Sequence, residues 1–408
     1  MLLQDTLAGV LREPHLPAAA PPQIPRALSG ELDLRAERAL VLTGVRRAGK
    51  STLQLQLMAR EARRPLYCSF EDTRLFGFGP ADFPAWLALA DELFPGAAVF
   101  LDEVQEVDQW QRLVRALIDR GRMVCVTGSN ASILGRDAGT KLTGRHESHE
   151  VFPFSYAEFC AYTSAAAGPD SLRQYLDAGG FPGFLRDRHD TVLQELLRDI
   201  VHRDVAARHG VRDTRHVMNL LLFLLAHAGQ TFSFQRLTKA LEVPTVAQTS
   251  RYVGFLEDAY LVFGVPKYSP SFRRRVVAPV KYFPVDNGLA RANSPQPQPD
   301  RGRRLETVVA QHLRRRAGSS PVSRGRAAVA YAAERDRWEC DFVTAEEAIQ
   351  VCFELTEANR AREVTGVREA ARLPGGRRPV IVTFDQSDRL REDGVEVAVV
   401  PAWQWLSR

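Results

Sequence analysis

Lysine is scarce in this chain of 408 residues. Lysine and arginine together number 54, but the sequence contains only five lysines, at positions 50, 141, 239, 267 and 281. A lysine that falls on the one position where a motif requires it is therefore informative. The net charge of +5 favours an anionic partner such as nucleic acid, although an arginine-rich surface without such a partner would give the same balance.

Long apolar runs and paired cysteines are also lacking. No apolar run reaches the roughly 18 residues that a membrane-spanning helix needs, and the stretch from Met1 to Arg12 is too short, and too interrupted by acidic residues, for a secretory signal. The cysteines are odd in number and show no paired spacing, so we expect reduced core residues rather than zinc ligands or disulfides. A cytoplasmic protein with no membrane association is therefore expected. The cysteines are Cys68, Cys125, Cys160, Cys340 and Cys352.

A glycine-rich loop is the most informative segment that is present. The residues Gly44-Val-Arg-Arg-Ala-Gly-Lys-Ser-Thr52 follow the apolar run 39–43 and precede the amphipathic stretch 53–59, which predicts the strand, loop and helix of a P-loop. Backbone N–H groups of such a loop bind the β- and γ-phosphates of a nucleotide, Lys50 reaches those phosphates, and the Ser51 hydroxyl suits Mg²⁺. The predicted cofactors are ATP and Mg²⁺. The loop residues predicted to bind them are Gly44, Arg46, Arg47, Ala48, Gly49, Lys50, Ser51 and Thr52.

A second apolar strand ends in two carboxylates. Residues 97–101 precede Asp102 and Glu103, as in a Walker B strand. Asp102 is the second predicted metal ligand and would hold Mg²⁺ through water or through Ser51, whereas Glu103 would polarise the attacking water. A surface Asp-Glu pair at a strand end is the alternative interpretation, and the neighbouring P-loop argues against it.

A third strand, residues 123–127, ends in Gly128-Ser129-Asn130. This places a polar side chain where it could orient the water beside the γ-phosphate. We assign that role to Asn130, or else to Ser129. The glutamate after Asp102 and the polar end of this strand indicate hydrolysis rather than a GTPase switch.

The segment from Thr214 to Phe263 follows the order of a winged helix-turn-helix, with its candidate recognition helix at residues 246–259. Many winged helices pack only against protein, so both DNA contact and protein packing remain open. Three arginines follow where a wing would approach phosphates. The residues expected to face outward or to contact DNA are Thr245, Gln248, Thr249, Arg251, Tyr252, Arg273, Arg274 and Arg275.

The C-terminal part is expected to be a mixed α/β unit with the layout of a PD-(D/E)XK nuclease core. A helix carries Glu306 and a hairpin strand carries Asp341, but the next strand has Gln350 where a carboxylate is needed and Cys352 where a lysine is needed to steer water. Glu354, on the same face of that strand, could partly compensate for Gln350. The sequence therefore predicts a degenerate, inactive nuclease site that is used for binding.

The assembled motifs resemble the AAA-type ATPases of bacteria and archaea that carry a C-terminal domain of unknown function. The resemblance covers about residues 27–405. It rests on the P-loop together with these motifs: Phe100-Leu-Asp-Glu-Val-Gln105, Val126-Thr-Gly-Ser-Asn130, Leu142-Thr-Gly-Arg145, Phe152-Pro-Phe-Ser-Tyr-Ala-Glu-Phe159, Gly179-Gly-Phe-Pro182, Lys281-Tyr-Phe-Pro-Val-Asp-Asn-Gly288 and Ile349-Gln-Val-Cys352.

The resemblance implies that Arg145 contacts a γ-phosphate or acts as an arginine finger, where it would stabilise charge in the transition state. Arg136 is a competing candidate, and a surface salt bridge is the alternative role for Arg145. The family also implies an AAA-like core, a helical lid with a winged helix, and a nuclease-like domain.

The predicted fold class is α/β, with an AAA-like P-loop ATPase core, a helical lid, a winged helix-turn-helix and a C-terminal α/β restriction-endonuclease-like domain. The predicted function is Mg²⁺-dependent ATP hydrolysis coupled to DNA, in an oligomeric remodelling or translocating enzyme such as a helicase. The alternatives are an ATP-gated regulatory or defence switch that binds a protein partner, and an ATP-dependent nuclease. The predicted segments are 1–34 (helix and linker), 35–155 (ATPase core), 156–213 (lid), 214–291 (winged helix) and 292–408 (nuclease-like domain).

Overall fold

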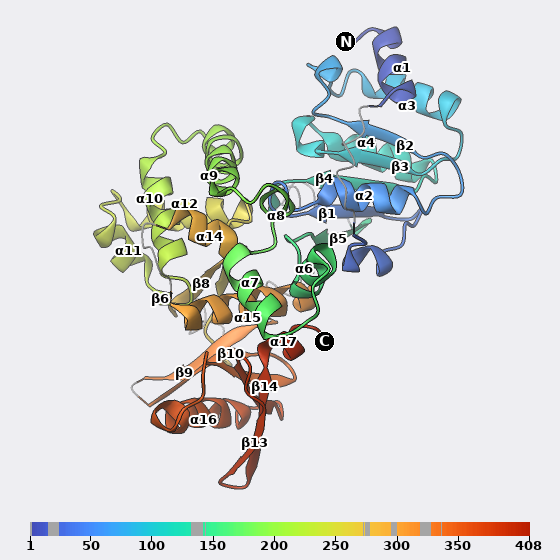
Figure 1. Ribbon diagram of the computed structural model, residues 1–408. Coiled ribbons are helices and arrows are strands. Elements are labelled where there is room, and N and C mark those ends of the chain that lie inside the picture. Colours follow the sequence, from blue (N-terminus) through green and yellow to red (C-terminus); the bar gives the residue numbers. More distant parts are fainter. Residues whose placement is uncertain are drawn as a thin grey trace. The chain divides into compact units, whose positions relative to one another are not determined.

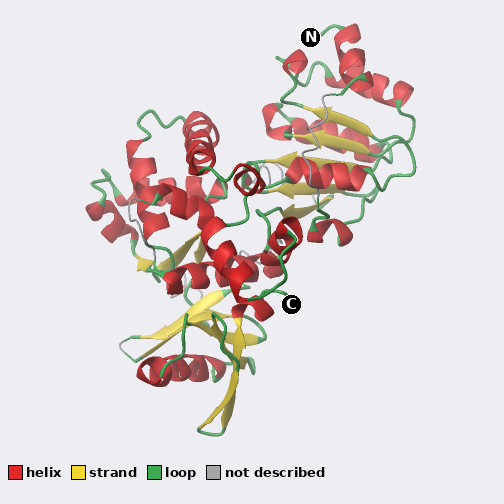
Figure 2. Cartoon of the chain, in the orientation of Figure 1, coloured by secondary structure: helices red, strands yellow, loops and turns green. Residues whose placement is uncertain are grey.

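The computed structural model divides into two compact units, Met1–Phe152 and Pro153–Arg408, whose elements are labelled in Figure 1. It describes residues 2–14, 24–131, 142, 144–271, 273, 278–294, 300–318, 328–335 and 337–408. Figure 2 shows helices and strands alternating in the first unit and separate helical and sheet regions in the second. The predicted α/β class is confirmed. The finer division of the second unit into lid, winged helix and nuclease-like domain stays a prediction.

The first unit is built on a five-stranded parallel sheet with the order β2-β3-β4-β1-β5. Strands β1, β3 and β4 are buried along their whole length, as expected for strands covered on both faces. Their carboxyl ends meet at one edge, because all the strands run in the same direction. The strands are β1 (Ala39–Thr43), β2 (Leu66–Ser69), β3 (Val99–Asp102), β4 (Val124–Gly128) and β5 (His146–Glu150).

Helices α1 (Gln4–Arg12), α2 (Lys50–Met58), α3 (Phe83–Leu93) and α4 (Trp110–Asp119) pack around this sheet (Figure 1). Helix α1 buries Leu7, Val10 and Leu11 in the same core as Trp86 of α3. The N-terminal helix, which sequence analysis separates from the ATPase core, therefore contributes to the core of the first unit.

The second unit begins with a helical region. Helix α6 starts with a capping box in which Ser155 accepts a hydrogen bond from the backbone of Glu158 and the Glu158 side chain accepts one in return. A π-helical segment, Ile200–Ala207, continues α9. Helix α14 packs against α7 and α9. The helices are α6 (Tyr156–Thr163), α7 (Pro169–Ala178), α8 (Pro182–Asp187), α9 (Asp190–Asp199), α10 (Arg215–Ala226) and α14 (Asn287–Asn293).

A small antiparallel sheet with the order β6-β8-β7 follows α10. Two helices, α11 (Phe234–Ala240) and α12 (Val246–Asp258), lie in the chain between β6 and β7. The side chains of Ser233 and Thr245 cap them by accepting hydrogen bonds from backbone N–H groups. The strands are β6 (Thr231–Phe232), β7 (Val262–Val265) and β8 (Val280–Pro284).

The C-terminal region contains a six-stranded mixed sheet with the order β13-β14-β12-β11-β10-β9. Helix α16 packs against β10, β11 and β12, whereas α15 contacts both β11 and β8 of the small sheet. Strand β13 was not expected from the sequence. The elements are α15 (Arg301–Ala317), β9 (Ala330–Glu334), β10 (Trp338–Val343), β11 (Glu347–Val351), α16 (Glu357–Ala371), β12 (Arg378–Thr383), β13 (Asp388–Glu392), β14 (Val395–Pro401) and α17 (Ala402–Trp405). None of the described helices combines the length and the apolar character needed to cross a membrane.

Candidate functional site

The P-loop joins the carboxyl end of β1 to the first residue of α2, which is Lys50. Gly44 and Gly49 have φ angles of 140° and 98°, which side chains rarely tolerate. A Cβ at Gly44 would lie 2.1 Å from the carbonyl oxygen of Val151, and a Cβ at Gly49 would lie 2.7 Å from Nη1 of Arg26. The loop therefore requires glycine at both places, as expected for a backbone cradle that approaches phosphate closely.

Lys50 is buried within this loop. Its ammonium donates hydrogen bonds of 3.0 Å to the carbonyl of Gly44 and 3.2 Å to that of Val45. The side chain is thus curled over the cradle and needs only to exchange these carbonyls for phosphate oxygens when a nucleotide binds. The other predicted loop residues differ in exposure: Arg46 pairs with Glu71 at 3.2 Å, Arg47 is exposed, Ala48 is buried and Thr52 is half-buried.

Asp102 ends β3 and accepts hydrogen bonds from three hydroxyl groups. Ser51 and Tyr67 each donate to Oδ2 at 2.9 Å, and Thr127 donates to Oδ1. The pKa of Asp102 lies above its usual value because the carboxylate is buried. The hydrogen bonds from Thr127, Ser51 and Tyr67 offset part of this increase. The structure therefore brings together the two predicted Mg²⁺ ligands, Ser51 and Asp102, and holds the carboxylate in place with two residues that sequence analysis missed.

Glu103 adopts a left-handed backbone conformation, with φ 52° and ψ 50°, which is uncommon for a residue with a side chain. Its backbone N–H donates a hydrogen bond of 2.9 Å to Oγ1 of Thr127, and its carboxylate accepts one from Gln105. Thr127 therefore contacts both the carboxylate of Asp102 and the backbone of Glu103.

Strand β4 lies between β1 and β3 in the sheet, so its end meets the P-loop and the two carboxylates at the same edge. Ser129 and Asn130, which follow β4, are both buried. Ser129 accepts a 3.4 Å hydrogen bond from Gln105, the residue that also contacts Glu103. The sheet order thus places the residues that follow β4 at the same edge as the candidate general base, and Ser129 shares the Gln105 side chain with Glu103.

Arg145 lies at the other edge of the sheet. It precedes β5, whose first residue pairs in register with Ala39 at the start of β1, whereas the P-loop follows the end of β1. Five residues of extended chain span about 16 Å, and the half-exposed guanidinium is held by Asp119 at 2.5 Å. Arg145 therefore cannot reach the γ-phosphate of its own chain, which corrects that part of the expectation. The competing Arg136 lies outside the described residues.

Arg26 is a buried contact of the P-loop that sequence analysis did not identify. Its guanidinium donates hydrogen bonds of 2.8 Å to the carbonyl of Ala48 and 2.7 Å to that of Phe152. Because the two carbonyls belong to the P-loop and to the last residue of the first unit, one cation ties these segments together. No local motif marks this arginine, which directly follows a segment rich in proline and alanine.

These residues fit a nucleoside triphosphate with Mg²⁺. The cradle has no room for side chains at its two glycines, and hydroxyl and carboxylate oxygens are ligands that Mg²⁺ prefers. Lys50 and the loop N–H groups would hold the phosphates, and Ser51 and Asp102 would hold the metal. All of these residues belong to the first unit.

Helix α12 only partly presents the residues that were expected to face outward. Thr249 is buried, with a 2.7 Å hydrogen bond to Thr238, and Tyr252 is also buried and accepts a hydrogen bond from Gln248. Their predicted outward orientation is wrong, because they lie on the apolar face of the helix. Thr245 caps the helix, and Arg251 is exposed.

The other residues that were predicted to contact DNA do not lie in one place. Gln248 and Arg251 line a cavity of about 230 Å³ together with residues 209–213. Beside it, the ring of His209 stacks on Phe255 with centroids 3.8 Å apart. Arg273 is exposed, whereas Arg274 and Arg275 lie outside the described residues.

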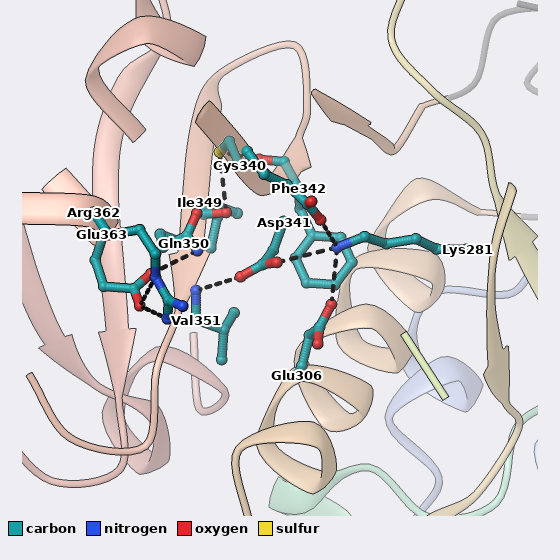
Figure 3. Close-up of polar contacts among 11 residues, drawn as sticks. Lys281, Glu306, Cys340, Asp341, Phe342, Ile349, Gln350, Val351, Arg362 and Glu363 are labelled. Carbon is teal, nitrogen blue, oxygen red and sulfur yellow. Dashed lines mark hydrogen bonds and ion pairs between the residues drawn. The ribbon is translucent and has the colours of Figure 1, made fainter. Parts of the chain in front are cut away.

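The four residues of the predicted degenerate nuclease site come together on the wall of one cavity of about 830 Å³. They are Glu306 of α15, Asp341 of β10, Gln350 of β11 and Cys352. Gln350 turns away from Asp341 and donates a 2.8 Å hydrogen bond to Glu363 of α16 (Figure 3). Glu354 also lines the cavity.

Three carboxylates, those of Glu306, Glu339 and Asp341, form a carboxylate cluster around the ammonium of Lys281 in β8. Figure 3 shows Lys281 with Glu306 and Asp341. The ammonium lies 3.3 Å from Glu306, 3.2 Å from Asp341 and 2.7 Å from Glu339. Burial lowers the pKa of Lys281, but the three negative charges outweigh burial and raise it well above its usual value. The scarcity of lysine, which makes Lys50 informative, applies equally to Lys281 and is the signal in the sequence that marks it.

Comparisons with known proteins agree with the nucleotide site. Residues 36–160 match the family described as AAA domain, and residues 169–300 match a domain of unknown function, DUF8612. An uncharacterized protein of Methanocaldococcus jannaschii is 27% identical in an alignment of 404 residues that covers 92% of this chain and 89% of that protein. An uncharacterized protein of Haemophilus influenzae is 30% identical in an alignment of 390 residues that covers 89% of this chain and 93% of that protein.

Among solved structures, the Orc1 protein of Aeropyrum pernix in complex with DNA shows 12% identity and a TM-score of 0.28, over 69% of this chain and 94% of that one. Such a low score carries no argument about this chain. The AAA domain match and the extended similarity to the Haemophilus influenzae protein are independent of it. Residues 36–160 therefore form an AAA domain with a P-loop, and the chain belongs to the same family as the Haemophilus influenzae protein.

Proposed function

We propose that this protein is a Mg²⁺-dependent ATP hydrolase whose nucleotide cycle is coupled to DNA binding. The observation that carries the hydrolytic part is the hydrogen-bonded series Ser51, Asp102, Thr127 and Glu103 at the edge of the sheet beside the P-loop. This series links the two metal ligands to the candidate general base through one threonine.

In this mechanism, Lys50 and the P-loop N–H groups bind and orient the β- and γ-phosphates. Bound Mg²⁺ supplies charge neutralisation of the phosphate oxygens during transfer. Glu103 accepts the proton of the attacking water, and Asn130, or else Ser129, orients that water. The buried position of these groups limits access of bulk water and strengthens their electrostatic effect.

The DNA-binding part rests on the order of elements in residues 214–291. Helix α10, strand β6, helices α11 and α12, and strands β7 and β8 follow the order of a winged helix-turn-helix. The first turns of α12 leave Val246, Ala247, Ser250 and Arg251 exposed, and Arg273 is exposed after β7. Residues 156–213 would then form the helical lid. The enzyme would act on DNA, by remodelling or translocation, as an oligomer.

The test is ATP turnover by the full chain without DNA and with single-stranded, duplex, forked and four-way DNA. We expect stimulation by at least one of these, and weaker stimulation after replacement of Arg251 and Arg273 by alanine. A lower salt dependence of binding in that variant would identify phosphate contacts, because each neutralised phosphate releases counterions. Turnover that is indifferent to every DNA would remove the DNA-coupled part and leave the ATPase.

A second candidate function is an ATP-gated switch, of a regulatory or defence type, that binds a protein partner. It is favoured by the burial of Thr249 and Tyr252 and by the cavity that residues 209–213 form with Gln248, since both reduce the surface of α12 that could read bases. Under this function, DNA would leave turnover unchanged, and alanine at Arg251 would not alter it.

The third alternative, an ATP-dependent nuclease, has less support. Gln350 contributes no charge to a metal and is engaged by Glu363, and Cys352 cannot replace a cationic lysine beside a scissile phosphate. Prolonged incubation with plasmid, linear and branched DNA in Mg²⁺ or Mn²⁺ should leave all of them intact. Cleavage that disappears on Asp341→Ala would restore this alternative.

A further inference from the structure

The contacts of Lys281 differ from those of a surface ion pair. The side chain is only 4% exposed, and its three carboxylate partners come from α15 and β10, whereas Lys281 itself comes from β8 of the small sheet. Burying an ammonium in protein is costly unless charged partners and hydrogen bonds compensate for the lost water. Here the compensation consists of three acidic side chains within 3.3 Å.

The carboxylates are themselves held in place. Oδ2 of Asp341 accepts a 3.0 Å hydrogen bond from the backbone N–H of Val351, while Oδ1 faces Lys281. Glu306 packs so closely against Gly229 that a Cβ there would lie 2.8 Å from its Oε2. Glu306 and Asp341 thus present oxygens to one point from two separate elements, and the ammonium of Lys281 fills that point.

The neighbouring cavity is acidic. Of the described residues that line it, seven carry carboxylates and five carry guanidinium groups. Without Lys281, the excess of negative charge at its wall would attract a cation rather than a phosphodiester. Carboxylate oxygens are the ligands that Mg²⁺, Ca²⁺ and Mn²⁺ favour, yet within the described part of the chain no group of three His, Cys, Asp or Glu side chains is arranged to hold a metal ion.

We propose that Lys281 is the resident cation of this carboxylate cluster: it takes the place of a divalent metal between Glu306 and Asp341 and excludes one. The cluster is consequently a metal-independent clamp between the small sheet and the six-stranded region. Replacing the ammonium with an apolar side chain of similar length leaves the carboxylates uncompensated and converts the cluster into a divalent-cation site.

The experiment measures Mn²⁺ binding to the full chain without nucleotide, by electron paramagnetic resonance of free Mn²⁺, in wild type, Lys281→Met and Lys281→Arg. Any Mn²⁺ bound at Ser51 and Asp102 is common to all of them. Lys281→Met should bind one additional Mn²⁺ per chain, whereas Lys281→Arg, which keeps the charge, should match wild type. In Lys281→Met combined with Asp341→Asn, the additional binding should disappear.

Thermal unfolding monitored by circular dichroism decides the result if Lys281→Met is poorly folded. In that case Mn²⁺ should raise its unfolding temperature by several degrees and should leave that of Lys281→Arg unchanged. The proposal is overturned if Lys281→Met neither binds additional Mn²⁺ nor is stabilised by it. It is equally overturned if wild type already binds Mn²⁺ in a manner that Asp341→Asn abolishes.

Discussion

The guanidinium of Arg26 donates a hydrogen bond of 2.8 Å to the carbonyl of Ala48, in the turn of the P-loop just before Gly49. The same side chain holds the carbonyl of Phe152, and it is almost completely buried. The position of the phosphate-binding backbone therefore depends on a residue that precedes β1 and has no place in the P-loop motif.

Arg26→Met should weaken ATP binding by about tenfold while the protein stays folded. The change leaves two buried carbonyl groups without their donor, and hydrogen bonds to charged groups contribute about 1.5–3 kcal/mol. The measurement is the dissociation constant of ATP by calorimetry. Arg60→Met is the matched control, because Arg60 also donates to backbone carbonyls but lies at the surface. An equal loss in both variants would contradict a specific role for Arg26.

Lys50 and Glu103 should affect different steps. Lys50→Ala should abolish nucleotide binding, because the loop loses the cation that reaches the phosphates, whereas Glu103→Gln should bind ATP and fail to hydrolyse it. Calorimetry and phosphate release separate the two effects. Glu106→Gln removes an exposed carboxylate in the short 3₁₀ helix Val104–Glu106, which directly follows Glu103, and it should behave like wild type. Normal turnover in Glu103→Gln would remove Glu103 from the role of general base.

Thr127→Val should reduce the turnover number by about 10- to 100-fold with a small change in KM for ATP. Valine keeps the shape of the side chain but removes both the hydrogen bond to Asp102 and the acceptor for the N–H of Glu103; a loss of about 1.5–3 kcal/mol is expected. Thr127→Ser keeps the hydroxyl and should retain most activity. If the valine and serine variants turned over ATP equally fast, the hydroxyl would have no part in positioning these carboxylates.

Arg145 should act on the nucleotide of a neighbouring subunit, since it lies at the edge of the sheet opposite its own P-loop. Arg145→Ala should lower turnover sharply with little loss of ATP affinity, and mixing it with Lys50→Ala protein should restore part of the activity. Asp119→Asn removes the observed partner of Arg145 but keeps the arginine, so it should remain active. Full activity of Arg145→Ala in a monomeric preparation would rule out this role.

The second unit should lose stability as the pH falls from 7 to 5. Burial, and then the charges of Arg315 and Arg316, lower the pKa of His312 to about 3, and its ring lies 4.9 Å from that of Trp405. The unfolded chain takes up a proton near pH 6.5 while the folded chain does not, so acid favours unfolding. The loss is about 2 kcal/mol at most, as measured by urea unfolding at the two pH values. His312→Phe should remove this part of the pH dependence; an unchanged dependence would exclude His312 as its source.

The local order of residues was sufficient to predict the P-loop, the strand that ends in Asp102 and Glu103, and the polar end of β4. Each of these signals lies within fewer than ten consecutive residues, where strand, turn and helix preferences act directly. The inward orientation of Thr249 and Tyr252 could also have been predicted. Their spacing of three or four residues from Val253 and Leu256 places all four on one buried face of α12. Strand β13 could not, since Leu390 is its only buried residue.

The sequence by itself therefore predicts a nucleotide-binding P-loop and the residues that would face the phosphates, because that chemistry is encoded in contiguous segments. Only the tertiary structure decided which side chains from distant parts of the sequence hydrogen-bond to the functional groups and hold them in place. Tyr67 reaches Asp102 across 35 positions of chain, and Lys281 reaches Asp341 across 60. Such pairs form when separate elements pack together and a buried charge must find a partner, and no periodicity in the sequence records which partner that will be.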